Sequence, residues 1–459
     1  MRRSRNTIFR LRIGISRSVD QNIAIGRTYD TFAPARDALS FTWLDAAAFV
    51  APTLMCVEVR IVGRLFGSDV FLLAILPLLL RSRWRLLTAR LPRTVLRLEL
   101  LWLAGQVATD LWRRTPFEDL ARGWNMIAFG LFHFATLYML LYGSRQRIVE
   151  YAIGLAAGGI LAFFFDPSDY AAAYPWKFGV GGPITILIVV AATAIFSAGS
   201  VFAASATLLF AACLNLYMGS RGASGFGFIV LAYIVMERES ARLNRASRTA
   251  KIALGIAVLA AVAGTFKIYN LAATAGLLGF HAQQEYEGQS AGEFGVLLGG
   301  RGEIFSSALA IRDAPILGHG SWAMDTDYAL QGQMTMGDLG YRPLAPDPQA
   351  AAGLIPSHSY LFGAWVDAGI LGAIFWAWVF TVAIRAMLGL FRMAEPLSPL
   401  IAFFLVSFAW DLLFSPYGAQ QRFFASYEIV LAVYVLESAL ISVSSAGAFA
   451  RRAAGAGQA

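Results

Sequence analysis

The stretch GVGGPITILIVVAATAIFS (residues 179–197) contains no charged side chain and is rich in small and β-branched apolar residues. Its length matches the ~20 residues that an α-helix needs to cross a ~30 Å hydrocarbon layer. A second apolar run, residues 201–218, follows almost immediately. Two such runs in close succession predict a pair of helices that crosses a membrane twice.

The composition extends this interpretation to nearly the whole chain. Hydrophobic residues make up 58% of the sequence and charged residues only 14%, against about 25% charged residues in soluble domains. The apolar runs are continuous and not alternating, which favours helices over a membrane barrel. We therefore expect an all-α membrane protein with about twelve spans, near residues 41–57, 65–80, 94–112, 124–142, 148–165, 179–197, 201–218, 223–236, 252–269, 364–390, 397–415 and 423–442.

The basic residues predict the orientation of these spans. Roughly two thirds of them fall in alternate short loops or in the tails, which is typical of cytoplasmic segments. We therefore expect an Arg-rich N-terminal tail (1–40) and a C-terminal tail (443–459) in the cytoplasm. Transmembrane helices 1–9 then occupy 41–269, and helices 10–12 occupy 358–442.

Residues 270–357, here called the polar segment, interrupt the pattern. The segment is far longer than an ordinary connection, has the composition of a soluble protein and is predicted to lie outside the cytoplasm. Within it, residues 303–312 are predicted to form a short amphipathic helix that ends before Pro315. Gly318–His319–Gly320 is typical of a turn. We expect the chemistry of the protein to be done in this segment.

Several classes of function lack their sequence signals. The chain has no phosphate-binding loop of nucleotide hydrolases, no dinucleotide-binding fingerprint and no His-Glu-x-x-His motif, so a substrate would have to arrive already activated. The net charge of +8 is not arranged as a basic groove with aromatic residues, and no nucleic-acid partner is expected. Cys56 and Cys213 lie in separate apolar runs and cannot form a metal site alone.

Three basic residues stand out on the predicted outer side: Arg221 between two spans, Arg301 in the polar segment, and His358 where that segment returns to the membrane. Each also has a structural interpretation, as a helix cap, a solvated charge or a polar residue at a helix start. Two guanidiniums can bind a diphosphate without a metal and stabilise its charge as it leaves. An imidazole can accept a proton from a hydroxyl. Together they suit glycosyl transfer from a lipid diphosphate.

Other residues are secondary candidates. Arg422, Tyr341 and Arg342 lie on the predicted outer side and are candidates for binding the substrate. Asp325-Thr-Asp327 matches the Asp-x-Asp pattern that holds a divalent metal in some glycosyltransferases. A solvated pair that forms a turn is the alternative interpretation of these two aspartates, and no metal site is predicted.

The motifs around these residues resemble a known family. The segment from Arg301 through Arg312-Asp-Ala-Pro-Ile-Leu-Gly-His-Gly320 is similar to the loop signature of the superfamily of O-antigen ligases and O-antigen or exopolysaccharide polymerases. Two further stretches carry the resemblance, Ser220-Arg221-Gly222 and His358-Ser-Tyr-Leu361 followed by Gly369-Ile-Leu-Gly372. The expected architecture also resembles that family along nearly the whole chain.

The resemblance implies a function. Arg221 and Arg301 would hold the undecaprenyl diphosphate of a glycan donor, and His358 would assist an acceptor hydroxyl. The enzyme would be an inverting, metal-independent glycosyltransferase without a cofactor, in the bacterial inner membrane and surrounded by membrane lipids. A ligase acting on lipid A–core is favoured, and a polymerase that extends lipid-linked repeat units remains open. Ser359 and Gly302-Glu303 depart from the family pattern.

Two other classes of function remain open. A transporter would suit the number of spans and the charges of Asp45, Arg97 and Glu99 within or beside them. The long polar segment and the absence of internal repeats speak against it. A non-catalytic component of an envelope assembly is the third class.

Overall fold

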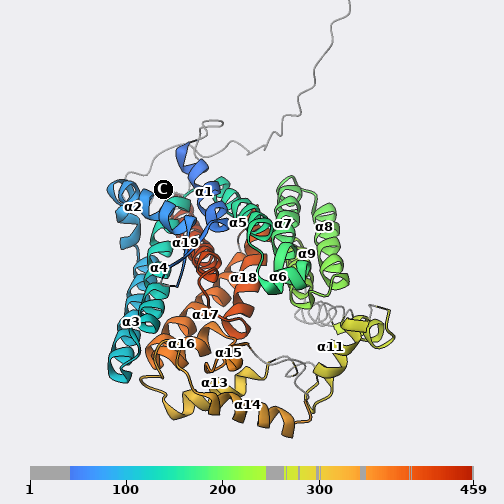
Figure 1. Cartoon of the computed structure of the whole chain (residues 1–459). Coiled ribbons are helices and arrows are strands. Elements are labelled where there is room, and N and C mark those ends of the chain that lie inside the picture. The colour runs from blue at the N-terminus through green and yellow to red at the C-terminus, as the bar shows by residue number, and fades with distance from the viewer. Residues whose placement is uncertain are drawn as a thin grey trace, which may run out of the picture.

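The computed structural model describes residues 42–61, 63–243, 263–264, 266–277, 280–295, 299, 301–341, 348–391, 393 and 395–456. Within these ranges the chain is a bundle of helices with one small hairpin (Figure 1). The elements are, in order, α1 (Trp43–Thr53), η1 (Leu54–Cys56), β1 (Glu58–Ile61), β2 (Gly63–Phe66), α2 (Gly67–Arg83), η2 (Trp84–Thr88), α3 (Arg90–Arg113), α4 (Phe117–Leu141), α5 (Arg145–Phe165), α6 (Asp169–Ala173), η3 (Pro175–Val180), α7 (Gly181–Ser197), α8 (Val201–Tyr217), α9 (Arg221–Leu243), α11 (Phe280–Ser290), α13 (Glu303–Asp313), α14 (Thr326–Asp338), α15 (Pro348–Ala351), α16 (Tyr360–Ala368), α17 (Ile370–Leu390), α18 (Ser398–Phe414) and α19 (Gln421–Ala456).

Five helical stretches of the described chain are long and apolar enough to cross a membrane: Phe117–Leu141, Arg145–Phe165, Pro175–Ser197, Ile370–Leu390 and Gln421–Leu440. Three shorter apolar helices accompany them: Trp43–Cys56, Val201–Tyr217 and Ser398–Phe414. The all-α class and the character of a membrane protein are thus confirmed. The count of twelve spans stays a prediction, and the span at 252–269 falls largely outside the described residues.

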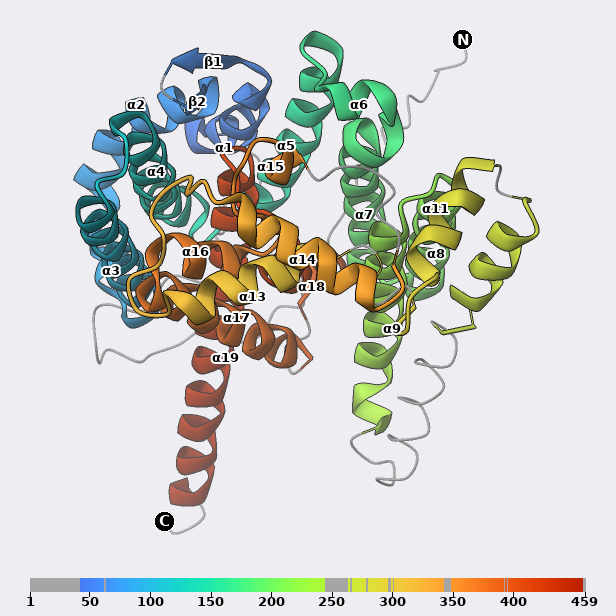
Figure 2. The ribbon, with the colours of Figure 1, turned by 60° about the horizontal axis from the view of Figure 1, so that its bottom comes forward.

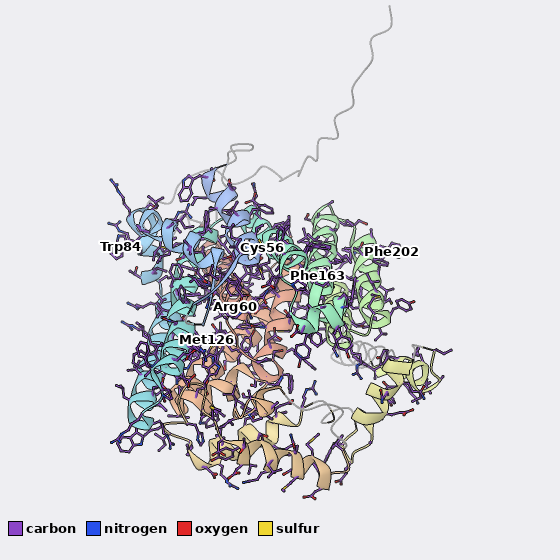
Figure 3. All side chains as sticks on the ribbon, viewed as in Figure 1. Cys56, Arg60, Trp84, Met126, Phe163 and Phe202 are labelled. Carbon is purple, nitrogen blue, oxygen red and sulfur yellow. The ribbon has the colours of Figure 1, made fainter. Side chains whose placement is uncertain are left out.

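The bundle has a tightly packed centre and apolar outer edges. Trp102 of α3 stacks on Phe375 of α17 with 5.3 Å between the ring centroids, and both rings are almost fully buried. Trp84 and Phe202, which Figure 3 labels on opposite sides of the molecule, are 52% and 84% exposed. Outward-facing aromatic side chains at both edges suit a surface that is covered by lipid.

A short antiparallel hairpin, β1–β2, lies between α1 and α2 and was not expected from the sequence. Gly63 has a φ of 82° at its turn, a conformation that glycine adopts without strain. Glu58 of β1 accepts hydrogen bonds from the Nε atoms of Arg60 on the same strand (2.9 Å) and of Arg64 on β2 (2.8 Å), and the second bond joins the two strands. Each strand has four residues, too few for periodicity to reveal them between two apolar spans.

The predicted span at 364–390 is two helices, not one. Gly369 has a φ of 65° and separates α16 from α17. The amide of Ile370 donates to the carbonyl of Ile316 at 3.1 Å, so the polar segment inserts at this break. A continuous helix is excluded there because a left-handed residue ends the hydrogen-bond pattern. Within this predicted span, α17 alone is long and apolar enough to cross a membrane.

The polar segment forms a cap on one end of the bundle. Helices α13 and α14 lie across the ends of α16, α17 and α18, as Figure 2 shows from the side of the cap. The predicted helix at 303–312 is confirmed as α13, Glu303–Asp313. Asp110 of α3 fixes the cap because it accepts from the amide of Ser321 at 2.7 Å and from its hydroxyl at 2.8 Å. The cap is thus bonded to the bundle through buried groups and is not a free loop.

Candidate functional site

Arg301 lies immediately before α13 and is held against two aromatic rings of α18. Its guanidinium carbon is 4.6 Å from the centroid of Trp410 and 4.3 Å from that of Phe414. Cations favour such positions over ring faces, where the π electrons are concentrated. The charge of Arg301 therefore lies at the end of α18, at the boundary between the cap and the bundle.

Arg221 reaches the same region from another part of the chain. It opens α9 directly after the α8–α9 turn, where Gly219 has a φ of 79°. Helix α9 packs on α18, and the rings of Phe226 and Trp410 are 5.9 Å apart. The pKa of Arg301 is lowered, first by burial and then by the positive charge of Arg221. The two guanidiniums are thus close enough to influence each other's charge.

His358 completes the cluster. Its Nδ1 lies 3.8 Å from Oε1 of Glu303, the first residue of α13. The next residue, Ser359, is the N-cap of α16: its hydroxyl accepts from the amide of Phe362 at 3.1 Å and donates to the carbonyl of Leu412 at 2.8 Å. These bonds fix the backbone beside the imidazole. Glu303 is only two residues from Arg301 in the sequence. The guanidinium and the imidazole are therefore both placed near the start of α13.

The structure thus brings Arg221, Arg301 and His358 together from the start of α9, the start of α13 and the start of α16. A cationic pair beside an imidazole and a carboxylate can bind a dianion and accept a proton from a neighbouring hydroxyl. Glu303 is the member that the sequence did not single out. Its position directly after the glycine-rich residues 299–302 is the sequence feature from which it could have been predicted.

Arg422, a candidate for substrate binding, is placed elsewhere. It is 2% exposed, forms an ion pair with Asp69 and donates to the carbonyl of Arg64 at 3.1 Å. His133 of α4 is also fully buried, with its Nε2 2.8 Å from Oδ1 of Asp69. The guanidinium is surrounded by the rings of Phe66, Phe129 and Phe423. Arg422 therefore joins α2, α4 and α19 inside the bundle and does not face a substrate.

Tyr341 is also a structural residue. Its side chain is 4% exposed, its hydroxyl donates to the carbonyl of Gly295 at 2.8 Å, and it accepts from the amide of Phe294 at 3.1 Å. These bonds fasten two parts of the cap to each other, so the buried Tyr341 has a structural role, and its contact with substrate stays a prediction. Arg342 lies outside the described residues.

The aspartates of the Asp-x-Asp pattern form a helix cap. Asp325 is the N-cap of α14, and its carboxylate accepts from the amide of Asp327 at 3.0 Å. This is the turn-forming alternative of the two interpretations. Among the residues that the structure describes, no group of three His, Cys, Asp or Glu side chains is placed to hold a metal ion.

The three charged residues that would suit a transporter, Asp45, Arg97 and Glu99, lie in different environments. Asp45 caps α1, where it accepts from the amide and the hydroxyl of Thr42, both at 2.7 Å. Arg97 is exposed on α3, whereas Glu99 is 3% exposed and packs against Gly130. These three residues therefore do not converge on one pathway.

No protein-family model, no curated protein and no solved structure matches this chain. The resemblance to the O-antigen ligase and polymerase superfamily accordingly depends on the short motifs around Arg221, Arg301 and His358. What the site does is inferred below from its chemistry and from those motifs.

Proposed function

We propose that this protein is a membrane glycosyltransferase that moves a glycan from a polyprenyl diphosphate to an acceptor hydroxyl on the outer side of the inner membrane. The observation that carries the proposal is the convergence of Arg221, Arg301 and the Glu303–His358 pair at the junction of cap and bundle. A lipid diphosphate presents a dianion at the membrane surface, and this junction offers two guanidiniums at the ends of apolar helices.

In the proposed reaction the acceptor oxygen attacks the anomeric carbon of the donor glycan. The bond between that carbon and the phosphate oxygen breaks, and its electron pair leaves with the diphosphate. Arg221 and Arg301 bind the diphosphate and stabilise the charge that develops on it. The acceptor's proton passes to His358. Attack from the face opposite the leaving group inverts the configuration of the sugar.

Glu303 assists this proton transfer as a positioning residue. Its carboxylate lies 3.8 Å from Nδ1 of His358 in the absence of substrate, and a modest approach would bring the two groups within hydrogen-bond distance. A carboxylate beside one ring nitrogen sets the orientation of the ring and stabilises its protonated form. The other ring nitrogen is then the one that faces the acceptor.

The proposal is tested with Arg221→Ala, Arg301→Ala and His358→Ala in the producing bacterium. Removing a group that stabilises the transition state should lower transfer on the order of 10²-fold. Each variant should therefore accumulate carrier-linked glycan at unchanged protein abundance. Arg312→Ala is the control, because Arg312 lies at the far end of α13, where its side chain is 68% exposed and paired with Asp313. Normal surface glycan in an Arg301→Ala, His358→Ala double variant would overturn the proposal.

The acceptor distinguishes a ligase from a polymerase. We favour a ligase, in which the acceptor is lipid A–core. Purified protein should then transfer labelled glycan from undecaprenyl diphosphate only when lipid A–core is added. Condensation of lipid-linked units with one another in its absence would assign a polymerase.

A further inference from the structure

A cavity of about 230 Å³ lies between the cap and the bundle, next to the Glu303–His358 pair. Its walls come from α3, α4, α16, the cap and the turn before α19. Helix α4 contributes Gly123 and Met126, of which Figure 3 labels Met126. Its lining combines aromatic and polar side chains with small and aliphatic ones. The residues that matter for the argument are Trp102, Gln106, Trp322, Ser357, Asp367 and Tyr417.

Trp322 is held at the wall of this cavity by a strained backbone. Its φ is 52°, a left-handed conformation that a bulky residue rarely adopts. The preceding residue, Ser321, is fixed by its two hydrogen bonds to Asp110. Strain of this kind persists where the surroundings enforce it, and it is concentrated at ligand sites. A rigid indole is therefore maintained at the surface of the cavity.

Asp367 adds an acidic group to the wall. Its side chain is deeply placed but retains exposure to the cavity. Burial, and then the nearby Asp110, raise the pKa of Asp367 to about 8. Near neutral pH the carboxyl group is thus mostly protonated, so it can donate a hydrogen bond as well as accept one. That combination matches a hydroxyl group, which also does both.

We propose that this cavity binds one sugar ring of the glycan, in the position next to the ring that reacts. A pyranose has C–H faces that pack on aromatic side chains and a rim of hydroxyls that need polar partners, and both kinds of wall are present. The inference is based on the proposed function and adds a subsite to it. Ser357 and Ser359 line the cavity, whereas His358 between them does not.

Because Ser357 and Ser359 line the cavity and His358 does not, we infer that the bound ring lies next to the reacting sugar and is not the reacting sugar itself. Residues 355–359 have no helical structure, and Ser359 has extended angles (φ −156°, ψ 134°). Successive side chains of an extended segment point to opposite sides. The backbone at His358 therefore forms a wall one residue thick, with the cavity on one side and the Glu303–His358 pair on the other.

The first test measures binding without catalysis. Full-length protein in lipid nanodiscs, free of sugar-based detergent, is examined by saturation-transfer NMR with a panel of methyl hexopyranosides and N-acetylhexosaminides. At least one glycoside should receive saturation from the wild type. The signal should be lost in Asp367→Ala, which removes both the donor and the acceptor, and in Trp322→Gly. Glycine suits a positive φ, so the second variant removes the indole and relieves backbone strain at the same position.

Matched controls separate this effect from general damage. Asp338→Ala changes an exposed aspartate of the cap, and Trp112→Phe changes an aromatic residue of α3 that is 73% exposed. Both should keep the signal. Absence of saturation transfer to every glycoside in the wild type would overturn the inference, as would equal signals in the wild type and both cavity variants. Neither outcome bears on whether Arg301 binds a diphosphate.

The second test identifies which substrate supplies the ring. In the transfer assay, an acceptor subsite predicts that Asp367→Ala raises KM for the acceptor at least tenfold with little change in KM for the lipid-linked donor. The opposite pattern would assign the ring to the donor glycan. Unchanged KM values for both substrates would contradict the proposed subsite and would leave the proposed reaction unaffected.

Discussion

Glu303 is the residue on which the chemistry of the site can be tested most finely. Glu303→Gln keeps the shape of the side chain but removes the charge beside His358. We expect kcat to fall roughly tenfold, a modest part of the effect of general base catalysis, with little change in KM for the donor. Steady-state transfer assays measure both constants.

Glu293→Gln is the control for that substitution, because Glu293 is an exposed acid elsewhere in the cap. Glu303→Asp should recover part of the activity, since it restores the charge. A loss of thermal stability in Glu303→Gln with kcat preserved would show that the carboxylate supports the fold and not the imidazole.

Arg422 makes a contrasting prediction at the same scale. Removing one partner of a buried ion pair leaves the other charge uncompensated, which costs about 3–5 kcal/mol in soluble proteins. Arg422→Ala should therefore lower the melting temperature and the abundance of the protein. An Asp69→Ala, Arg422→Ala double variant should be less destabilised than the sum of the two single changes. If Arg422→Ala folds normally but transfer is abolished, the structural role is contradicted and Arg422 acts in substrate binding.

Sequence reasoning identified some of these residues and not others for a clear physical reason. Arg221 and Arg301 stand out because arginines on the predicted outer side go against the usual distribution of basic residues. His358 stands out because it lies where the polar segment is predicted to return to the membrane. Arg422 gives the same signal, but its partner Asp69 lies far away in the sequence. Only the folded bundle, in which Asp69 of α2 contacts Arg422 of α19, shows that the charge is already neutralised. Glu303 was hidden because its partner, too, is distant in sequence.

At the scale of elements, Gly369 decides where a helix crosses the membrane. Its φ of 65° and the close approach of the Ile316 carbonyl leave no space for a side chain. Gly369→Ala should destabilise the protein by about 1–3 kcal/mol and lower its melting temperature. Gly182→Ala in α7 is the matched control, because a methyl group there would meet nothing within 4 Å and helix propensity favours alanine. Equal stability of the two variants would contradict this account of the break.

The elements that were predicted well are those whose apolar runs are long. Residues 148–165, 179–197 and 201–218 correspond to α5, α7 and α8 within a few residues, whereas the prediction 124–142 misses the first two turns of α4 (Phe117–Leu141). The span over 364–390 was predicted as one helix because hydropathy does not register a single left-handed glycine. The β1–β2 hairpin was missed for a related reason, since its strands are shorter than any window that detects periodicity.

The orientation of the whole molecule is a separate prediction from its fold. In a variant without Cys56 and Cys213, single cysteines are introduced as Gln333→Cys on α14 and Ser82→Cys at the end of α2, both exposed positions. A membrane-impermeant maleimide added to intact spheroplasts should label only Gln333→Cys, because the polar segment is expected outside. Ser82→Cys should react after permeabilisation. The reverse pattern would place the cap in the cytoplasm and remove the proposed acceptor.

The bonds between the cap and the end of α16 have a consequence for biogenesis. The amides of His319 and Gly320 donate to the carbonyls of Val366 and Asp367, at 2.7 and 3.0 Å. These carbonyls belong to the last turn of a helix, which has no partners of its own for them, and unsatisfied backbone groups are expensive near lipid. The ribosome makes residues 316–320 before α16 and α17. If the polar segment lies outside the cytoplasm, as predicted, its translocation must be complete before α16 and α17 can settle. A delay in its export should then leave the C-terminal part of the protein open to proteolysis.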